Sequence, residues 1–338
     1  MATGVNSDAP IFIVGCPRSG TTLLRNLLRS HPNLTFPRES YFIPTFYRSY
    51  GDPRDAAEAR RLAKRILKLR WVRSWGMPMD AEAFADCRTF REVVCRLYET
   101  WARKQDKLRW GDKTPHYVTE LPILLKLFPG AKIIHIYRDG RDVALSWIHG
   151  RFGPGNMYTA ARLWKWYVNS GRRAGAALPK ETYLEVPYEQ LLQQPRETMQ
   201  QVCEFVGEPF DEAVLRPSAF PPNPLNPFPI HQGALQLVRR AEIFPANSLK
   251  WQTRMPVSDR VLFESVAGDL LEILGYETEG HIRSISLPER LAWHVHQQVM
   301  WCSVRLRALN REAFSATLPE MILARVRTAL RRAATQRL

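Results

Sequence analysis

Residues 11–28 read IFIVGCPRSGTTLLRNLL, and the order of their apolar, glycine and polar residues gives the first indication of the fold. Residues 11–14 form a short, apolar and mostly β-branched run, which is typical of a buried strand. A loop bounded by Gly15 and Gly20 follows at once, and leucines then recur at helical spacing. The helical pattern ends before Pro32, because the residue preceding a proline disfavours the α region. The stretch predicts a strand, a tight loop and a helix in direct succession.

The same pattern recurs twice along the chain. Residues 131–137 (AKIIHIY) predict a second buried strand, which ends at an Arg-Asp-Gly turn before another helix. Residues 182–186 predict a third strand, followed by a helix over 195–206 that Gly207 can cap. Strands that alternate with helices predict an α/β fold, with a parallel sheet flanked by helices.

Further segments complete this outline. Amphipathic runs over 55–73 and 81–104 predict a helical insertion on the surface. The proline-dense stretch 217–229 predicts an extended loop that could cover a cleft, and 258–274 predicts a helix closed by a glycine. The basic, tryptophan-containing helices that follow predict a separate C-terminal appendage.

The first loop has the features of an anion site. The spacing Gly15-xxxx-Gly20 between a strand and a helix resembles a nucleotide P-loop, in which backbone N–H groups and a helix N-terminus surround an anion. A full P-loop needs Lys after the second glycine, whereas Thr21 and Thr22 follow here. Arg18 inside the loop can supply the missing charge, with a planar fork suited to phosphate or sulfate oxygens. The structural alternative is a tight turn that only caps a helix.

The sequence PRSGTTL over residues 17–23 resembles the 5'-phosphosulfate loop of sulfotransferases that use 3'-phosphoadenosine-5'-phosphosulfate (PAPS). Arginine in this loop is similar to the tyrosylprotein sulfotransferase branch and its bacterial relatives, whereas cytosolic small-molecule sulfotransferases usually have lysine there. The resemblance extends over about residues 11–276. It implies a P-loop-type sheet, PAPS as co-substrate, adenosine 3',5'-bisphosphate as product and no metal. It also implies that PAPS is bound by five loop residues, namely Arg18, Ser19, Gly20, Thr21 and Thr22.

The second loop reads YRDGRDVALS over residues 137–146. Arg138 at the strand end and Ser146 on the following helix can grip a second phosphate at the crevice where open α/β sheets bind ligands. The segment resembles the 3'-phosphate motif of sulfotransferases, and this resemblance assigns that role to Arg138 and Ser146. Taken alone, the same residues are compatible with an Arg–Asp network on the surface.

Sulfuryl transfer needs a base for the acceptor hydroxyl and cations for the leaving phosphate. The resemblance to the tyrosylprotein branch implies that Glu39 is the general base and that Lys113 and Arg18 neutralise the leaving group. Without the resemblance, Glu39 is compatible with a solvated carboxylate beside Arg38. Because cytosolic sulfotransferases usually employ a histidine as the base, His116 and His149 are the alternative candidates for this role.

Two later matches to the family are weaker. Tyr188, in the VPYEQL segment, and the SLKW segment at 248–251 resemble cofactor contacts late in the family's domain. Ser248 joins the predicted catalytic set on this basis, although the register of this segment is open. Trp251 could stack on adenine through its broad π face, and a buried core tryptophan is an equal interpretation.

The charge of the chain bears on its partners and on its C-terminal region. The 338-residue chain carries a net charge of +15, which attracts anions without selecting one. Residues 281–338 contain ten Arg and three Glu, a local charge of +7. We expect a sulfotransferase domain over 1–278 and a basic helical extension over 279–338. The extension is predicted to pack on the domain, on a second subunit in a homodimer, or on an anionic membrane surface. Nucleic acid is the less favoured partner.

Five cysteines without paired spacing, and no leader or membrane-spanning run, predict a cytoplasmic protein that can be peripheral at a membrane. The predicted function is therefore an enzyme that transfers a sulfuryl group from PAPS to an acceptor hydroxyl on a glycan, lipid, tyrosine or small molecule. A P-loop kinase-like phosphotransferase and a non-catalytic anion- or nucleotide-binding module are the alternatives. The kinase would require a strand-end aspartate for magnesium, for which Asp112 and Asp139 are candidates.

Overall fold

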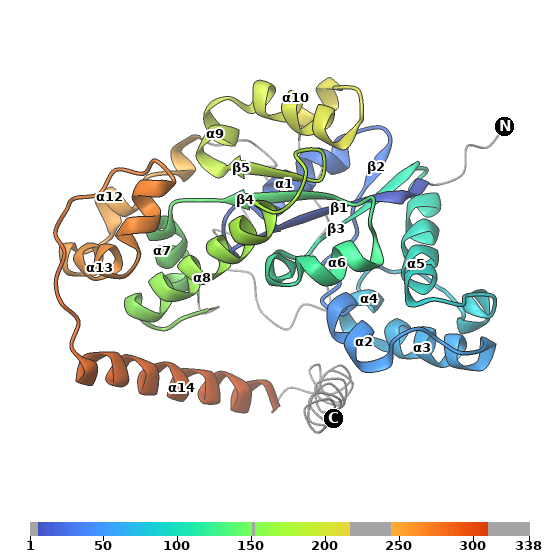
Figure 1. Cartoon of the computed structure of the whole chain (residues 1–338), viewed down its shortest axis with the longest axis horizontal. Helices are drawn as coiled ribbons and strands as arrows, with labels where there is room; N and C mark the ends of the chain where they lie inside the picture. The colour runs from blue at the N-terminus through green and yellow to red at the C-terminus, as the bar shows by residue number, and fades with distance from the viewer. Residues whose placement is uncertain (1–5, 151–152, 217–244, 310–338) are drawn as a thin grey trace.

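The computed structural model describes residues 6–150, 153–216 and 245–309, and its centre is a five-stranded sheet (Figure 1). The strand order is β2-β3-β1-β4-β5, and every neighbouring pair is parallel. The strands are β1 (Asn6–Gly15), β2 (Leu34–Thr35), β3 (Arg109–Lys113), β4 (Lys132–Tyr137) and β5 (Tyr183–Pro187). The expected parallel sheet is confirmed.

Both faces of the sheet are buried, which explains the continuous apolar runs in the sequence. Side chains alternate between the faces of a strand. Ile11 and Ile13 therefore enter one hydrophobic core, while Phe12 and Val14 enter the other.

A layer of helices covers each face (Figure 1). On the side of Ile11 and Ile13 the layer contains α1 (Thr21–Ser30), α9 (Tyr188–Gln193) and α10 (Pro195–Val206). The opposite core includes α5 (Phe90–Lys104), α6 (Leu121–Leu127), α7 (Gly140–Gly150), α8 (Met157–Gly175) and α13 (Val257–Ile273).

The helical insertion between β2 and β3 is confirmed in outline. It contains α2 (Ile43–Tyr50), α3 (Ala56–Lys68), α4 (Arg70–Arg73), the 3-10 turn η1 (Ala81–Phe84) and α5. The amphipathic run over 81–104 is divided into two elements, because the chain leaves helical geometry after η1 and restarts at Phe90. Thr89 and Glu92 form a capping box there, which satisfies two backbone N–H groups that a continuous helix would have bonded internally.

The short remaining elements connect this framework. They are η2 (Pro115–Thr119), η3 (Glu212–Leu215), η4 (Pro245–Asn247) and α12 (Trp251–Arg254). Gly207 caps α10 in the left-handed conformation as predicted, with φ of 78°. The proline-dense segment 217–229 lies outside the described residues.

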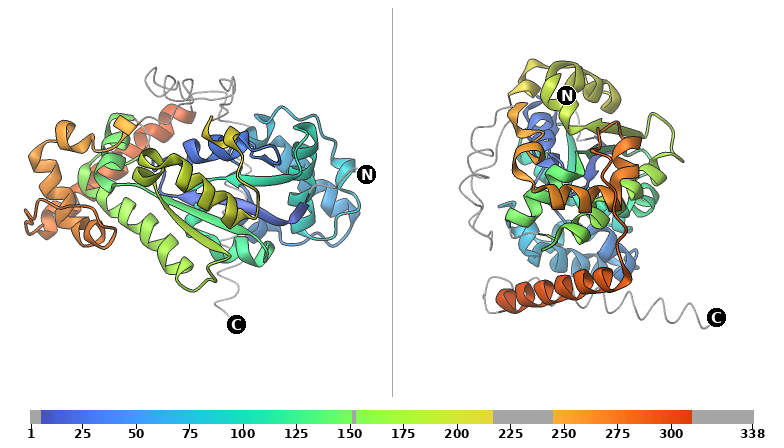
Figure 2. Two further views of the ribbon diagram at one scale, coloured as in Figure 1. Left: turned by 90° about the horizontal axis from the view of Figure 1, so that it is seen from above. Right: turned by 90° about the vertical axis from the view of Figure 1, so that its left-hand side faces the viewer.

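The last described element, α14 (Leu287–Leu309), lies along the outer side of the layer that contains α8 (Figures 1 and 2). Asn156 Nδ2 donates to the carbonyl of Trp293 at 3.2 Å, and the backbone N–H of Gly155 donates to Gln297 at 2.9 Å. Within the described part of the chain, no helix combines the length and the apolar character that crossing a bilayer requires. The domain boundary near residue 279 stays a prediction.

Candidate active site

The carboxyl ends of the five parallel strands meet at one edge of the sheet, and most of the predicted site residues lie at these strand ends or in the segments that follow them. β1 and β4, which are neighbours, end at the two predicted phosphate loops. β3 ends at Lys113, β2 leads to Glu39 after a few residues, and β5 leads into Tyr188. Open α/β sheets bind ligands at this edge, so the topology brings together residues that lie far apart in the sequence.

The first loop is a preformed cradle. β1 ends at Gly15, where a Cβ would lie 2.2 Å from the carbonyl oxygen of Ile136. The chain turns through a bond from the Ser19 N–H to the Cys16 carbonyl (3.2 Å), and α1 begins at Thr21. The first N–H groups of this ten-residue helix have no partners within the helix and point toward the loop. The buried Ser19 Oγ has no hydrogen-bond partner among the described residues.

Arg18 links the two predicted phosphate loops. Its φ of +77° places a long side chain in the left-handed region, which is uncommon and concentrates at functional sites. Its Nε donates to Ser146 Oγ at 2.8 Å, and Arg138 Nη1 lies 3.5 Å from the Arg18 carbonyl oxygen. The Arg18 side chain keeps contact with solvent, but desolvation by the surrounding protein and the charge of Arg138 lower its pKa. An anion placed between two such cations would stabilise both.

Arg138 is buried against the end of the sheet. It pairs with Asp142 at 2.7 Å and donates to the backbone carbonyl of Asn247. Its guanidinium carbon lies 4.7 Å from the ring centroid of Tyr188, and its buried Nε has no partner among the described residues. Arg138 is therefore held in one orientation and keeps a donor group available.

Lys113 and Glu39 form an ion pair at the end of β3. Lys113 Nζ contacts Glu39 Oε1 and lies 3.3 Å from Thr22 Oγ1 at the start of α1. Burial alone would raise the pKa of Glu39, but the charge and hydrogen bond of Lys113, together with a hydrogen bond from Tyr41, hold it below its usual value. Burial lowers the pKa of Lys113, and the charge of Glu39 opposes that effect. Glu39 is therefore paired with Lys113 at the strand end, and the alternative of a solvated carboxylate beside Arg38 is wrong.

Arg25 and Ser40 are site residues that were not predicted. Burial lowers the pKa of Arg25 to about 10, and the charge of Glu39 partly opposes this effect. The backbone N–H of Ser40 donates to Thr114 Oγ1 at 3.1 Å, and its hydroxyl lies 2.8 Å from the Tyr117 hydroxyl. A charged residue at a buried position of α1 was the available signal for Arg25, whereas a loop serine carries no such signal.

The late matches occupy different positions. Tyr188 is buried with its ring against Gly20 and Arg138. Ser248 is half-buried in the turn that follows η4. Trp251 is buried, and the guanidinium carbon of Arg141 lies 3.5 Å from its ring centroid. These contacts fit the interpretation of Trp251 as a core residue, and its stacking on adenine stays a prediction.

The alternative residues have other partners. His149 is exposed on α7 and its Nδ1 lies 2.9 Å from the Leu145 carbonyl oxygen of the same helix. His116 lies beside Tyr41, with ring centroids 5.7 Å apart. The carboxylate of Asp139 is bonded by Arg141, and that of Asp112 accepts from Tyr98. Neither aspartate is presented as the strand-end magnesium ligand of a kinase.

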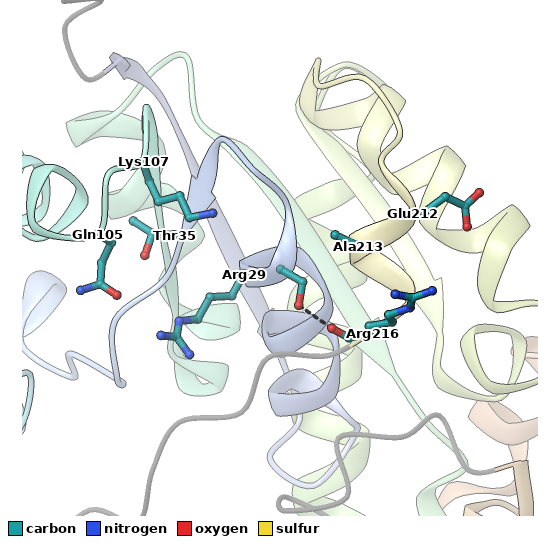
Figure 3. Close-up of a pocket in the computed structure, with 8 residues that line it drawn as sticks. Arg29, Thr35, Gln105, Lys107, Glu212, Ala213 and Arg216 are labelled. Atoms are coloured by element: carbon teal, nitrogen blue, oxygen red, sulfur yellow. Dashed lines mark hydrogen bonds between the residues drawn. The ribbon is translucent and has the colours of Figure 1, made fainter.

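A separate basic pocket of about 480 Å³ lies at the other end of α1 (Figure 3). α1 has ten residues and is therefore about 15 Å long, which separates this pocket from the phosphate loop. Two of the residues that line it are bonded to each other, since Ser30 donates to the Arg216 carbonyl oxygen at 2.7 Å. Its lining residues are Arg29, Ser30, Thr35, Gln105, Lys107, Glu212, Ala213 and Arg216. None of them is a predicted site residue.

The model of the sulfotransferase family matches residues 10–212, which include both phosphate loops, Glu39, Lys113 and Tyr188. The chain belongs to the sulfotransferase family. This sulfotransferase is similar to the protein-tyrosine sulfotransferase of Drosophila melanogaster, with 25% identity over 85% of this chain and 55% of that one. It is also similar to protein-tyrosine sulfotransferase 1 of Danio rerio, with 30% identity over 62% of this chain and 56% of that one. It therefore spans little more than half the length of these two relatives.

Solved structures agree on the fold of this sulfotransferase. The sulfotransferase domain of the Synechococcus PCC 7002 olefin synthase superposes with a TM-score of 0.56, at 24% identity, over 81% of this chain and 96% of that one. The domain from the curacin biosynthetic pathway superposes with a TM-score of 0.55, at 23% identity, over 80% and 98%. The P-loop-type sheet flanked by helices is thus confirmed.

Replacing Gly20 by alanine should destabilise the protein and distort its predicted phosphate loop. Gly20 has φ of +90°, and a Cβ there would lie 2.2 Å from Tyr188 Cδ2. We expect a loss of about 2–4 kcal/mol in the free energy of unfolding, measured by denaturant titration, because a left-handed alanine and a steric clash add up. If the loop is the predicted anion site, binding of anionic ligands should weaken as well.

Gly207→Ala is the matched control, because Gly207 also has positive φ but a Cβ there meets nothing within 4 Å. It should cost about 1–2 kcal/mol and leave ligand binding unchanged. Equal losses for the two variants would show that the contact between Gly20 and Tyr188 is unimportant.

Proposed function

We propose that this sulfotransferase takes its sulfuryl group from PAPS and transfers it to an acceptor hydroxyl, releasing adenosine 3',5'-bisphosphate. The observation that carries the proposal is the meeting of Arg18, Arg138 and Lys113 at one edge of the sheet, with Arg18 bonded to Ser146 across the two loops. Three cations from three different strand ends form a site for a ligand with several anionic groups.

The residues present fit such a donor. Ser19 Oγ and Arg138 Nε are buried donor groups with no partner in the described part of the chain, and such groups cost free energy unless a ligand or water bonds to them. Arg18, Ser19, Gly20, Thr21 and Thr22 would hold the 5'-phosphosulfate, and Arg138 and Ser146 the 3'-phosphate. Tyr188 would lie beside the nucleotide, with Ser248 and Trp251 as more distant candidates. When bound, PAPS supplies the sulfuryl group and a stable phosphate leaving group.

Glu39 is proposed as the general base. Its side chain is half-buried, its pKa lies below the usual value of a glutamate, and Lys113 holds it beside the cradle. A carboxylate in this position can accept the proton of an acceptor hydroxyl while the oxygen attacks. Lys113 and Arg18 then stabilise the negative charge that develops on the leaving phosphate.

The test is a turnover assay with PAPS that follows adenosine 3',5'-bisphosphate without added magnesium. Purified protein should release it slowly, and faster with the correct acceptor. Panels of tyrosine peptides, glycans, lipids and small phenols, offered with labelled PAPS, would identify the acceptor class. Consumption of ATP in place of PAPS would contradict the proposal, and binding of PAPS without transfer to any class would favour a non-catalytic module.

Arg138→Lys should reduce the ability to discriminate the 3'-phosphate. Lysine keeps the charge but loses the planar fork that bonds Asp142 and the Asn247 carbonyl and lies over Tyr188. We expect adenosine 3',5'-bisphosphate to bind about 10–100-fold more weakly, and adenosine 5'-monophosphate to change little, by calorimetry.

Arg196→Lys is the control, since Arg196 pairs with Glu212 on the exposed surface. It should leave both affinities unchanged. If Arg138→Lys lost equal affinity for both nucleotides, Arg138 would act through its charge on any anionic ligand and would not recognise the 3'-phosphate.

Residues 279–338 are proposed to form the extension, with packing on the domain, a homodimer contact and an anionic membrane as its candidate roles. The described part of α14 contacts α8 through one face and exposes Leu291, Val295 and Val299 on another. Association with vesicles containing anionic lipid, and the mass in solution, separate these roles. A cytoplasmic location stays a prediction.

A further inference from the structure

Tyr41 has a strained backbone beside the proposed base. Its φ is +59°, in the left-handed region where a bulky aromatic residue is a true outlier. Such a conformation is unfavourable and persists only where the surroundings fix it. Contacts around Tyr41 must therefore hold this backbone conformation next to Glu39.

The cause is a set of contacts on both sides of Tyr41. The preceding residue, Ser40, is buried and bonded to Thr114 and Tyr117, and the N–H of Ile43 donates to the Tyr117 hydroxyl at 3.0 Å. The ring of Tyr41 lies between Trp71 of α4 and His116 of η2, with centroid distances of 4.9 and 5.7 Å. The loop is therefore held by η2, by the residue that precedes it, and by α4.

The consequence is a hydrogen bond to the base. The Tyr41 hydroxyl donates to Glu39 Oε2, while Lys113 contacts Oε1. Burial and the adjacent Glu39 charge raise the pKa of Tyr41 well above its usual value, so its hydroxyl stays a donor throughout the neutral range. A carboxylate has about four acceptor positions, so these two bonds leave positions for an acceptor hydroxyl.

We propose that Tyr41 is a positioning residue that keeps the Glu39 carboxylate oriented and ionised when Lys113 turns to the leaving phosphate. The inference rests on the proposed function. In the transfer, the acceptor oxygen forms a bond to sulfur, the bond from sulfur to the leaving phosphate oxygen breaks, and the acceptor proton passes to Glu39. Lys113 serves both the base and the leaving group, and without Tyr41 the carboxylate would lose its second anchor at that moment.

The charged and titratable groups that face Glu39 come from several elements. The cations Lys113, Arg25 and Arg18 favour its ionised form. The carboxylate of Asp112 on β3 opposes ionisation of Glu39. His116 of η2 is a further titratable group that interacts with Glu39. The Tyr41 hydroxyl is the neutral donor among them. Its removal changes the pKa of Glu39 without changing the charge of the site.

Tyr41→Phe is the test, because it removes only the hydroxyl and keeps the ring between Trp71 and His116. We expect kcat to fall about 10–100-fold, with little change in KM for PAPS. The hydrogen bond lowers the pKa of Glu39, so its loss raises that pKa, and the acid limb of the pH–rate profile should move to higher pH. Tyr183→Phe is the control, since this hydroxyl bonds Glu185 in β5, away from the site.

A second measurement does not depend on turnover. Carbon-13 NMR of glutamate-labelled protein, with the Glu39 signal assigned through Glu39→Gln, should show Glu39 titrating at higher pH in Tyr41→Phe than in the wild type. If Tyr41→Phe proves unstable in thermal melting, Trp71→Leu, which loosens the ring but keeps the hydroxyl, should shift the titration in the same direction. An unchanged Glu39 titration overturns the inference whatever the activity, whereas failure of the wild type to use PAPS overturns the proposed function alone.

Discussion

Lys113→Met is expected to lower the rate of sulfuryl transfer by about 10²–10³-fold, the range seen when one preorganised electrostatic group is removed from a transition state. Lys113 is only 2% exposed and ends a central strand, so its position is fixed before the donor arrives. Methionine has a similar length and suits a buried position, which limits damage to the fold. Single-turnover kinetics with PAPS would measure the loss directly.

The same substitution has a second signature. Lys113 lowers the pKa of Glu39 by charge and hydrogen bonding, so its removal should raise that pKa and move the acid limb of the pH–rate profile to higher pH. Lys165→Met is the matched control, because Lys165 pairs with Asp269 on the surface between α8 and α13. A kcat within threefold of wild type would remove Lys113 from the mechanism.

Glu39→Gln is expected to lower kcat by about 10²–10⁴-fold while PAPS still binds, since it removes the proposed base but keeps the shape of the side chain. The amide oxygen can still accept from Tyr41, which preserves the loop. Binding of adenosine 3',5'-bisphosphate by calorimetry should stay within a few fold of wild type, because the phosphate loops do not use Glu39.

The control is Glu120→Gln, a carboxylate that pairs with Arg48 between α6 and α2. It should leave kcat unchanged. The double variant of Glu39→Gln and Lys113→Met should lose less than the product of the single losses, since the two residues act as one unit. Full activity of Glu39→Gln would transfer the role of base to His116, whose ring lies beside Tyr41.

Local patterns were sufficient for much of the fold. The strand over residues 11–14, the glycine loop and the leucine-rich helix appear as β1, the cradle and α1 because their apolar period and turn residues agree. β2 and β3 were not predicted. β2 has two residues, and β3 reads RWGDK, whose charged ends match no strand pattern. Its charges are tolerated because Arg109 pairs with Glu208 and Lys113 with Glu39.

The break between η1 and α5 shows a similar limit. The apolar spacing over 81–104 is compatible with one helix, and the capping box at Thr89 competes with it. A cap gains about 0.5–2 kcal/mol, which is enough to decide a helix start where the tertiary contacts favour a turn.

Local sequence patterns were enough to predict the α/β class and two loops at strand ends, because these features depend on residues within a few positions of one another. The phosphate-binding role of the loops came from the family resemblance and stays a prediction. The sequence also contained Glu39 and Lys113, which are 74 positions apart, but nothing local required them to meet. Only the tertiary structure placed them in one ion pair, joined Arg18 to Ser146, and brought Tyr41 onto Glu39. The physical reason is that parallel strands end at a common edge, so the sheet converts distance along the chain into proximity in space.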